Sequence, residues 1–278
     1  MTQNYFEPTW SSIKQHQTPN WFKKAKFGIY AHWGIYSVPA AGPNVTWYPY
    51  WMYRPPSPQF DYHCKHYGHP SKFGYKDFIP IFTAEKFNAD EWAELYYRSG
   101  AKFAGPVAEH HDGFPMWNCS DTEWCASKMG PKRDIVGELE KAIRNKGMKY
   151  MVAMHHAENW FFFPHWNNDF DTSKKEYESL YGELHNLDLI GNQAVYPDHW
   201  GRKNEHQDKP SKAFHERWLN RLKEVVDNYK PDYVWFDFGI RFIHEKYKKD
   251  FLSYYYNKET EWGLSLIHIS EPTRPTRI

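Results

Sequence analysis

The stretch Tyr233-Val-Trp-Phe-Asp-Phe-Gly239 gives the clearest indication of the fold of this chain. Its first four residues form an apolar run with the length and composition of a buried β-strand. The run ends in Asp237, and a carboxylate is costly to bury at a strand end unless it has a partner or a function. Asp237 is therefore the first candidate for a functional residue.

Other segments have the same form, a short apolar run that ends in ionisable side chains. They are residues 27–34, 103–114 and 150–156, which finish near His32, near His110, His111 and Asp112, and near His155 and His156. Strand alternation turns Glu109 away from the side to which His110 points, so we leave Glu109 out of the site. Four strand-like segments thus finish in groups that can bind a ligand or transfer a proton.

Helical patterns separate these strand-like segments. One helix is predicted to begin after the cap residue Asn88 and to end before Gly100, a second begins near Asp134, and a third spans about 211–229. The alternation of strands and helices predicts parallel strands joined by right-handed crossovers. Because the carboxyl ends of parallel strands share one edge, we expect the four strand-end groups to converge there.

Two architectures fit this order of elements, an open doubly wound sheet and a barrel. No Gly-x-Gly-x-x-Gly turn follows a predicted strand, and the loops after the strands are long and rich in Trp and Tyr. We therefore predict an α/β fold of the (β/α)8 TIM-barrel type, for which roughly 250 residues are typical. Only four strand–helix units precede residue 260, so we expect the barrel to be irregular and incomplete in this chain.

The chain is predicted to divide near residue 262. We expect residues 1–262 to form the partial catalytic barrel and residues 263–278 to be a non-native read-through tail. The stretch Gly263-Leu-Ser-Leu-Ile-His-Ile-Ser-Glu-Pro-Thr-Arg-Pro-Thr-Arg-Ile278 continues none of the preceding organisation and is similar to translated vector sequence. We therefore exclude this tail from the predicted fold.

Composition narrows the classes of function. The net charge of +1 gives no basic face for nucleic acid, and no long apolar stretch suits a membrane span. The first thirty residues contain no signal-peptide core, so the chain as written is expected to be cytoplasmic, with secretion left open.

Aromatic residues make up 19 % of the chain, and many lie in predicted loops. Such rings can pack on the C–H face of a sugar, although core packing explains a large share of them.

Three motifs resemble those of the α-L-fucosidases of glycoside hydrolase family 29. They are Phe27-Gly-Ile-Tyr-Ala-His-Trp-Gly-Ile-Tyr-Ser-Val-Pro39, Glu109-His-His-Asp-Gly-Phe114 and Trp235-Phe-Asp237. The resemblance covers about residues 20 to 260 in the family's order. It implies a retaining exo-α-L-fucosidase on an irregular barrel, with a fucosylated glycan as substrate and with no cofactor and no metal.

The resemblance also implies residue roles. Asp237 matches the nucleophile, which forms a covalent fucosyl-enzyme while a second carboxyl group about 5 Å away acts as acid and base. The predicted fucose-binding residues are His32, Trp47, His110, His111, His155 and Trp235. A neutral imidazole can donate from one nitrogen and accept at the other, which suits sugar hydroxyl groups. His155 is selected by its strand-end position, with a structural hydrogen-bonding role as the alternative.

The sequence departs from the family pattern in two ways. Thr46 stands where the family often has Glu, which removes one charged hydroxyl contact. The family's acid/base carboxyl lies some tens of residues after the nucleophile, and we identify no residue for it. We therefore expect a truncated chain that lacks the acid/base and has little or no turnover.

Other interpretations remain open. Asp237 could cap a loop or pair with Arg241. The same histidines could make a non-catalytic fucose-binding protein. A metal-dependent barrel hydrolase would use ligands from His110, His111, Asp112, His155 and Asp237, although the chain has no His-x-His on its first strand and no His-Glu-x-x-His.

Overall fold

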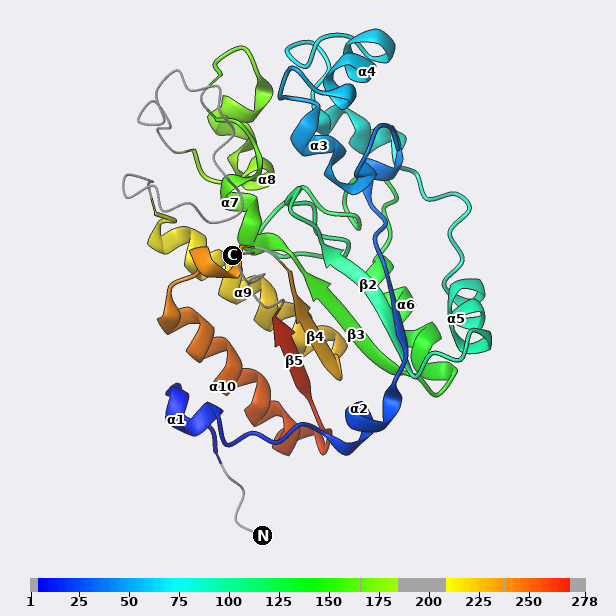
Figure 1. Ribbon diagram of the computed structural model, residues 1–278, viewed down its shortest axis with the longest axis vertical. Coiled ribbons are helices and arrows are strands. Elements are labelled where there is room, and N and C mark those ends of the chain that lie inside the picture. The colour runs from blue at the N-terminus through cyan, green and yellow to red at the C-terminus, as the bar shows by residue number, and fades with distance from the viewer. Residues whose placement is uncertain (1–4, 166, 185–208, 238, 271–278) are drawn as a thin grey trace, which may run out of the picture.

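The computed structural model describes residues 5–165, 167–184, 209–237 and 239–270. Within these residues the framework is a five-stranded sheet in the order β1-β2-β3-β4-β5 (Figure 1). The strands are Gly28–Ala31 (β1), Phe103–Glu109 (β2), Lys149–Met154 (β3), Tyr233–Phe236 (β4) and Ile267–Ser270 (β5). Each strand pairs in parallel with the next along the chain, which is the order of a (β/α) barrel wall. The α/β prediction is confirmed, and the described strands form an open sheet and no closed barrel.

Four longer helices provide the crossovers. They are Ala89–Arg98 (α5), Ile135–Asn145 (α6), Lys212–Tyr229 (α9) and Glu245–Trp262 (α10). They pack side by side in that order, and α6 also packs on β2 and β3. The predicted caps are present, because the side chains of Asn88, Asp134 and Ser211 accept hydrogen bonds from the first-turn amides of α5, α6 and α9.

Residues after 262 contribute to the sheet, contrary to our expectation. Leu266 and Ile267 are buried, and Ile267 pairs with Tyr233 of β4. The expectation that the tail lies outside the fold was therefore wrong for residues 267–270, because they pair with β4 as the fifth strand of the sheet. The division at residue 262 and the non-native origin of the tail stay predictions, and residues 271–278 lie outside the described part.

Short helical turns build the long loops. The α-helical ones are Trp10–Ile13 (α1), Asn20–Ala25 (α2), Tyr48–Trp51 (α3), Pro58–His66 (α4), Asn159–Phe162 (α7) and Glu178–Tyr181 (α8). The 3-10 turns are Ile35–Ser37 (η1), Val45–Trp47 (η2), Tyr75–Ile81 (η3), His156–Glu158 (η4), Asp171–Ser173 (η5), Lys175–Tyr177 (η6) and Ile240–Phe242 (η8). Figure 1 shows α3, α4, α7 and α8 standing beyond the carboxyl ends of the strands.

The two faces of the sheet bury different side chains. Val234 and Phe236 of β4 belong to the large core shared with the helix layer, whereas Tyr233 joins a smaller cluster on the opposite face. This alternation is the two-residue period of a strand.

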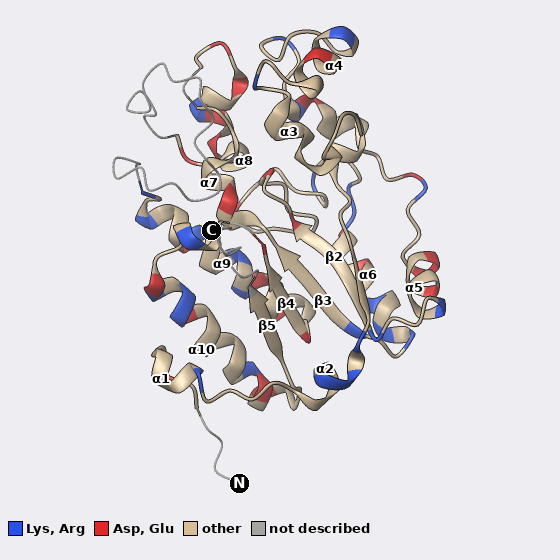
Figure 2. Ribbon diagram, viewed as in Figure 1, with Lys and Arg blue, Asp and Glu red and all other residues tan. Residues whose placement is uncertain are grey.

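Figure 2 shows charged residues on the helices and loops and almost none on the strands. In the described parts of the chain, no helix combines the length and the apolar character needed to cross a bilayer.

Asp232, just before β4, links three elements. Its side chain is fully buried, and its carboxylate accepts hydrogen bonds from Arg144 of α6 (2.9 Å), from Lys149 (2.7 Å) and from the Tyr150 amide (3.0 Å). The carboxylate therefore fixes the start of β4 against the start of β3 and the end of α6.

We expect Asp232→Ala to lower the free energy of unfolding by about 2–4 kcal/mol, because three donors lose their acceptor and one is a buried amide. Urea unfolding followed by circular dichroism measures this loss. The control is Asp250→Ala, which removes a partly exposed ion pair with Lys246 and should cost less than about 1 kcal/mol. Equal effects of the two substitutions would contradict the assignment.

Candidate active site

Strand register sets the positions of the strand-end groups. The pairing of β2 with β3 shifts by one residue between Val107 and Glu109. Glu109 then pairs with Met154, and Met154 pairs with Phe236, so the last residues of β2, β3 and β4 form one row. The next residue of each strand is His110, His155 or Asp237. The register therefore aligns these three side chains at the carboxyl edge of the sheet.

Four imidazoles gather at this edge. The ring centroid of His32 lies 5.5 Å from that of His110 and 5.3 Å from that of His155. The ring centroids of His110 and His155 are 5.3 Å apart. The His111 ring lies 4.5 Å from His110 and 5.0 Å from His155. The structure thus brings together the residues that we expected to converge.

Asp237 lies against two of these rings. Its Oδ2 atom is 3.2 Å from Nδ1 of His155 and 3.7 Å from Nε2 of His111, and its side chain is 14 % exposed. Nδ1 of His111 lies 3.0 Å from the backbone oxygen of His155. Because a carbonyl oxygen only accepts, Nδ1 carries a proton and donates it to this oxygen. The hydrogen bond orients the His111 ring so that Nε2 faces Asp237.

Burial controls the charge of the imidazoles. Desolvation lowers the pKa of His110 and of His155 well below the usual value, and neighbouring imidazoles lower it further. Burial also lowers the pKa of His32, although the charge of Asp237 acts in the opposite direction. Neutral rings keep one donor and one acceptor each. Neither ring nitrogen of His110 has a hydrogen-bond partner within the described residues.

The two predicted tryptophans occupy different places. Trp47, at the end of η2, is half-buried, and its ring centroid lies 5.2 Å from that of His111. Trp235 packs instead beside the smaller cluster of Met151, Tyr233 and Ile267, two residues before Asp237 on β4. Its indole N–H is buried without a partner among the described residues. The contact of Trp235 with a ligand stays a prediction.

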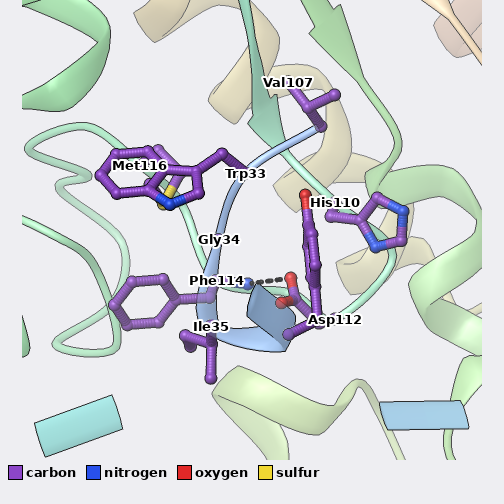
Figure 3. Close-up of a pocket in the computed structure, with 9 residues that line it drawn as sticks. Trp33, Gly34, Ile35, Val107, His110, Asp112, Phe114 and Met116 are labelled. Atoms are coloured by element: carbon purple, nitrogen blue, oxygen red, sulfur yellow. Dashed lines mark hydrogen bonds between the residues drawn. The ribbon is translucent and has the colours of Figure 1, made fainter. Parts of the chain in front are cut away.

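Asp112 lies apart from the imidazole group. Its carboxylate accepts hydrogen bonds from the Tyr75 hydroxyl (2.7 Å) and the Phe114 amide (3.2 Å), and Figure 3 shows it facing that amide. Burial raises the pKa of Asp112 to about 6. The geometry therefore gives Asp112 a structural role in the loop after β2.

Glu109 points to the helix layer, as strand alternation predicts. It forms a buried ion pair with Arg221 of α9, and its Oε1 lies 2.7 Å from Nδ1 of His156. Arg221 also donates to Asp121 at 3.0 Å. This network lies behind the strand ends and holds β2, η4 and α9 together.

Glu158 is a site carboxyl that our sequence analysis missed. It ends η4, is only 1 % exposed, and its Oε2 atom has no hydrogen-bond partner within the described residues. Burial raises the pKa of Glu158 to about 7, the charge of Asp237 raises it as well, and His111 and Arg241 act in the opposite direction. A single Glu in an aromatic loop carries no spacing signal that would have identified it.

The loop after Asp237 rests directly on Glu158. Gly239 has a φ of +84°, and a Cβ atom there would lie 2.4 Å from the backbone nitrogen of Glu158. Only glycine combines this backbone conformation with such a close approach. Gly239 therefore allows the loops after β3 and β4 to be in contact.

One group in the described residues has the spacing of metal ligands. Nitrogen atoms of His110, His111 and His155 all lie within 4.8 Å of one another. Asp112 and Asp237, which we also considered as ligands, are outside this group. The alternative of a metal site therefore retains geometric support.

Comparisons with known proteins give one consistent family. A family model described as alpha-L-fucosidase matches residues 1–272. Human plasma alpha-L-fucosidase is 34 % identical over 267 residues, which cover 93 % of this chain and 48 % of that protein. The Dictyostelium discoideum alpha-L-fucosidase is 31 % identical over 263 residues, which cover 92 % of this chain and 49 % of that protein. The Thermotoga maritima alpha-fucosidase in complex with fucose is similar at a TM-score of 0.70 and 33 % identity, covering 92 % of this chain and 55 % of that chain. The chain spans about half the length of the relatives it matches.

We expect Glu158→Gln to change how stability depends on pH. Because the pKa of Glu158 is raised from 4.5 to about 7, the folded chain binds more protons than the unfolded chain between these pH values. The contribution of Glu158 to stability is therefore full below pH 4.5 and is lost as the pH rises through 7. The glutamine variant lacks this loss and should gain on the order of 3 kcal/mol relative to the parent across the window.

Urea unfolding at a series of pH values measures this difference. Glu123→Gln is the control, because its side chain is 77 % exposed, and it should follow the parent at every pH. Parallel stability profiles for Glu158→Gln and the parent would refute the burial of an uncompensated carboxyl at this position.

Proposed function

The chain belongs to the alpha-L-fucosidase family, and we propose that its site binds a terminal α-L-fucosyl residue and cleaves it with retention of configuration. The observation that carries the proposal is the placement of Asp237 within 3.7 Å of two strand-end imidazoles. The relatives' names support the reaction class. A Thermotoga maritima relative was solved in complex with fucose, and again with a mechanism-based inhibitor, which supports fucose as the sugar to test.

The proposed first step forms a covalent intermediate on Asp237. A carboxylate oxygen of Asp237 attacks C1 of the fucosyl group, the bond from C1 to the leaving oxygen breaks, and that oxygen takes up a proton. Water then attacks C1 from the other side, loses a proton, and releases fucose and the free carboxylate. The side chain of Asp237 is 14 % exposed, which supports its contact with a bound sugar.

The imidazoles would hold the hydroxyl groups of the sugar. His110 has two ring nitrogens without protein partners in the described residues, so it can donate to one hydroxyl group and accept from another. His32 and His111 flank it and would extend the same pattern. Trp47, beside His111, would cover an apolar face of the ring, and the unpaired N–H of Trp235 would be a further donor.

The proton donor is not assigned to a residue. Glu158 has a pKa suited to a general acid, but its 1 % exposure leaves no path to a leaving group. We propose that Glu158 acts on Asp237 through its charge, because an ionised Glu158 disfavours a second negative charge nearby. Aryl fucosides with good leaving groups need less proton assistance and are therefore the substrates on which to test this chain.

We expect a 2-deoxy-2-fluoro-fucosyl donor with a dinitrophenyl leaving group to label Asp237. The fluorine slows both steps, and the good leaving group restores the speed of the first step only, so the fucosyl-enzyme accumulates. Peptide mass spectrometry should find one adduct, on the peptide that contains Asp237. Asp237→Asn should abolish the adduct and lower aryl-fucoside hydrolysis at least about 10³-fold.

Two controls define the outcome. Asp61→Asn, on the exposed surface of α4, should label like the parent. Binding of L-fucose without any adduct would support the non-catalytic fucose-binding alternative, and activity lost on treatment with a chelator would support the metal-dependent hydrolase. An adduct on another carboxylate would refute the assignment of Asp237.

A further inference from the structure

We propose that Asn159 is a positioning residue that holds His111 in the orientation in which its ring faces Asp237. The side-chain amide of Asn159 joins the loop after β2 to the loop after β3 and to α8. This placement of His111 is argued from contacts within the chain. Its effect on sugar binding rests on the proposed function, in which His111 holds a hydroxyl group of the fucosyl residue.

Both donors of the Asn159 amide are committed to backbone oxygens. Its Nδ2 atom donates to the oxygen of His111 at 3.0 Å and to the oxygen of Leu180 at 3.3 Å. An amide nitrogen has two N–H groups, so each acceptor receives one of them. The opposite orientation of the amide would place its oxygen against two carbonyl oxygens, which only accept. Asn159 is 1 % exposed, and buried bonds of this kind are costly to lose.

The segment from His155 to Asn159 holds His111 at two points. The backbone oxygen of His155 accepts from Nδ1 of the His111 ring at 3.0 Å, and Asn159 donates to the backbone oxygen of His111. The second contact fixes the main chain of His111, and the first fixes the rotation of its ring. With both in place, Nε2 of His111 lies 3.7 Å from Oδ2 of Asp237. Loss of the Asn159 bond removes one of these two anchors.

Two glycines pack directly on the Asn159 amide. A Cβ atom at Gly113, in the loop after β2, would lie 2.6 Å from Nδ2 of Asn159. A Cβ atom at Gly182, which follows α8, would lie 2.9 Å from Oδ1 of Asn159. Figure 1 shows α7, which begins at Asn159, and α8 close together beyond the strand ends. The amide therefore fills the junction of three loops, and a longer side chain such as glutamine would have to displace one of them.

The alternative is that Asn159 only satisfies two buried carbonyl groups. In that case its loss would lower the stability of the fold without moving the His111 ring. A positioning role predicts in addition that the ring changes its surroundings and that the sugar binds less tightly. A displacement of about 1 Å in a precisely arranged site can cost about 10²-fold.

The test compares Asn159→Ala with Asn257→Ala by NMR spectroscopy of chains labelled with ¹⁵N in histidine. Asn257 of α10 is the matched control, because its side-chain amide also bonds to backbone groups, those of Phe6. The Nδ1–H signal of His111, assigned with His111→Gln, should shift or broaden in Asn159→Ala and stay unchanged in Asn257→Ala. Asn159→Ser keeps one donor and should give an intermediate change, and it replaces the alanine variant if circular dichroism shows that variant to be unfolded.

Isothermal titration calorimetry with L-fucose gives the second measurement. We expect the dissociation constant to rise at least about tenfold in Asn159→Ala and to stay at the parent's value in Asn257→Ala. Unchanged His111 signals in a folded Asn159 variant overturn the positioning role. Changed signals with an unchanged affinity for L-fucose support the positioning role and refute the place of His111 in sugar binding. If the parent does not bind L-fucose, the proposed function fails, and the NMR comparison still decides the role of Asn159.

Discussion

The pairing register of β2, β3 and β4 is the constraint on which the candidate site depends. Glu109, Met154 and Phe236 lie in one row, so the next residue of each strand reaches the carboxyl edge at the same height. A slip of one residue in any pair would turn that strand's terminal side chain to the opposite face. The buried carboxylate of Asp232, which joins the start of β4 to the start of β3, holds this register from the other end of the strands.

The sheet separates two carboxylates that have different electrostatic partners. Glu109 faces the helix layer, where the permanent charge of Arg221 lowers its pKa against the effect of burial. Asp237 faces the loop side, where buried imidazoles are its neighbours at the strand ends. A carboxylate held by arginine is fixed as an anion and is structural. A carboxylate beside the imidazoles of the strand ends is placed for the part in the reaction that we propose for Asp237.

The sequence was informative where one residue type carries a strong physical signal. Apolar runs that end in His or Asp predicted the four strands and the convergence of their ends, because burying an ionisable group is costly without a reason. Helix caps such as Asn88 and Asp134 predicted where α5 and α6 begin. The α10 helix was missed because charged residues and three consecutive tyrosines obscure the helical period over 245–262 and hide its buried face, which contains Phe251 and Tyr255.

Other features depended on tertiary contacts that no local pattern encodes. Glu158 gains its importance only because η4 folds back under the loop that follows Asp237. Trp235 lies beside the smaller cluster on the sheet, a position that depends on Met151 and Ile267 of the neighbouring strands, and its contact with a sugar stays a prediction. The contact between the two loops requires Gly239, since a side chain there would collide with the backbone of η4. A relative with a bulkier residue at this position must space the loops after β3 and β4 further apart, so its carboxylates at the positions of Glu158 and Asp237 would lie at another separation.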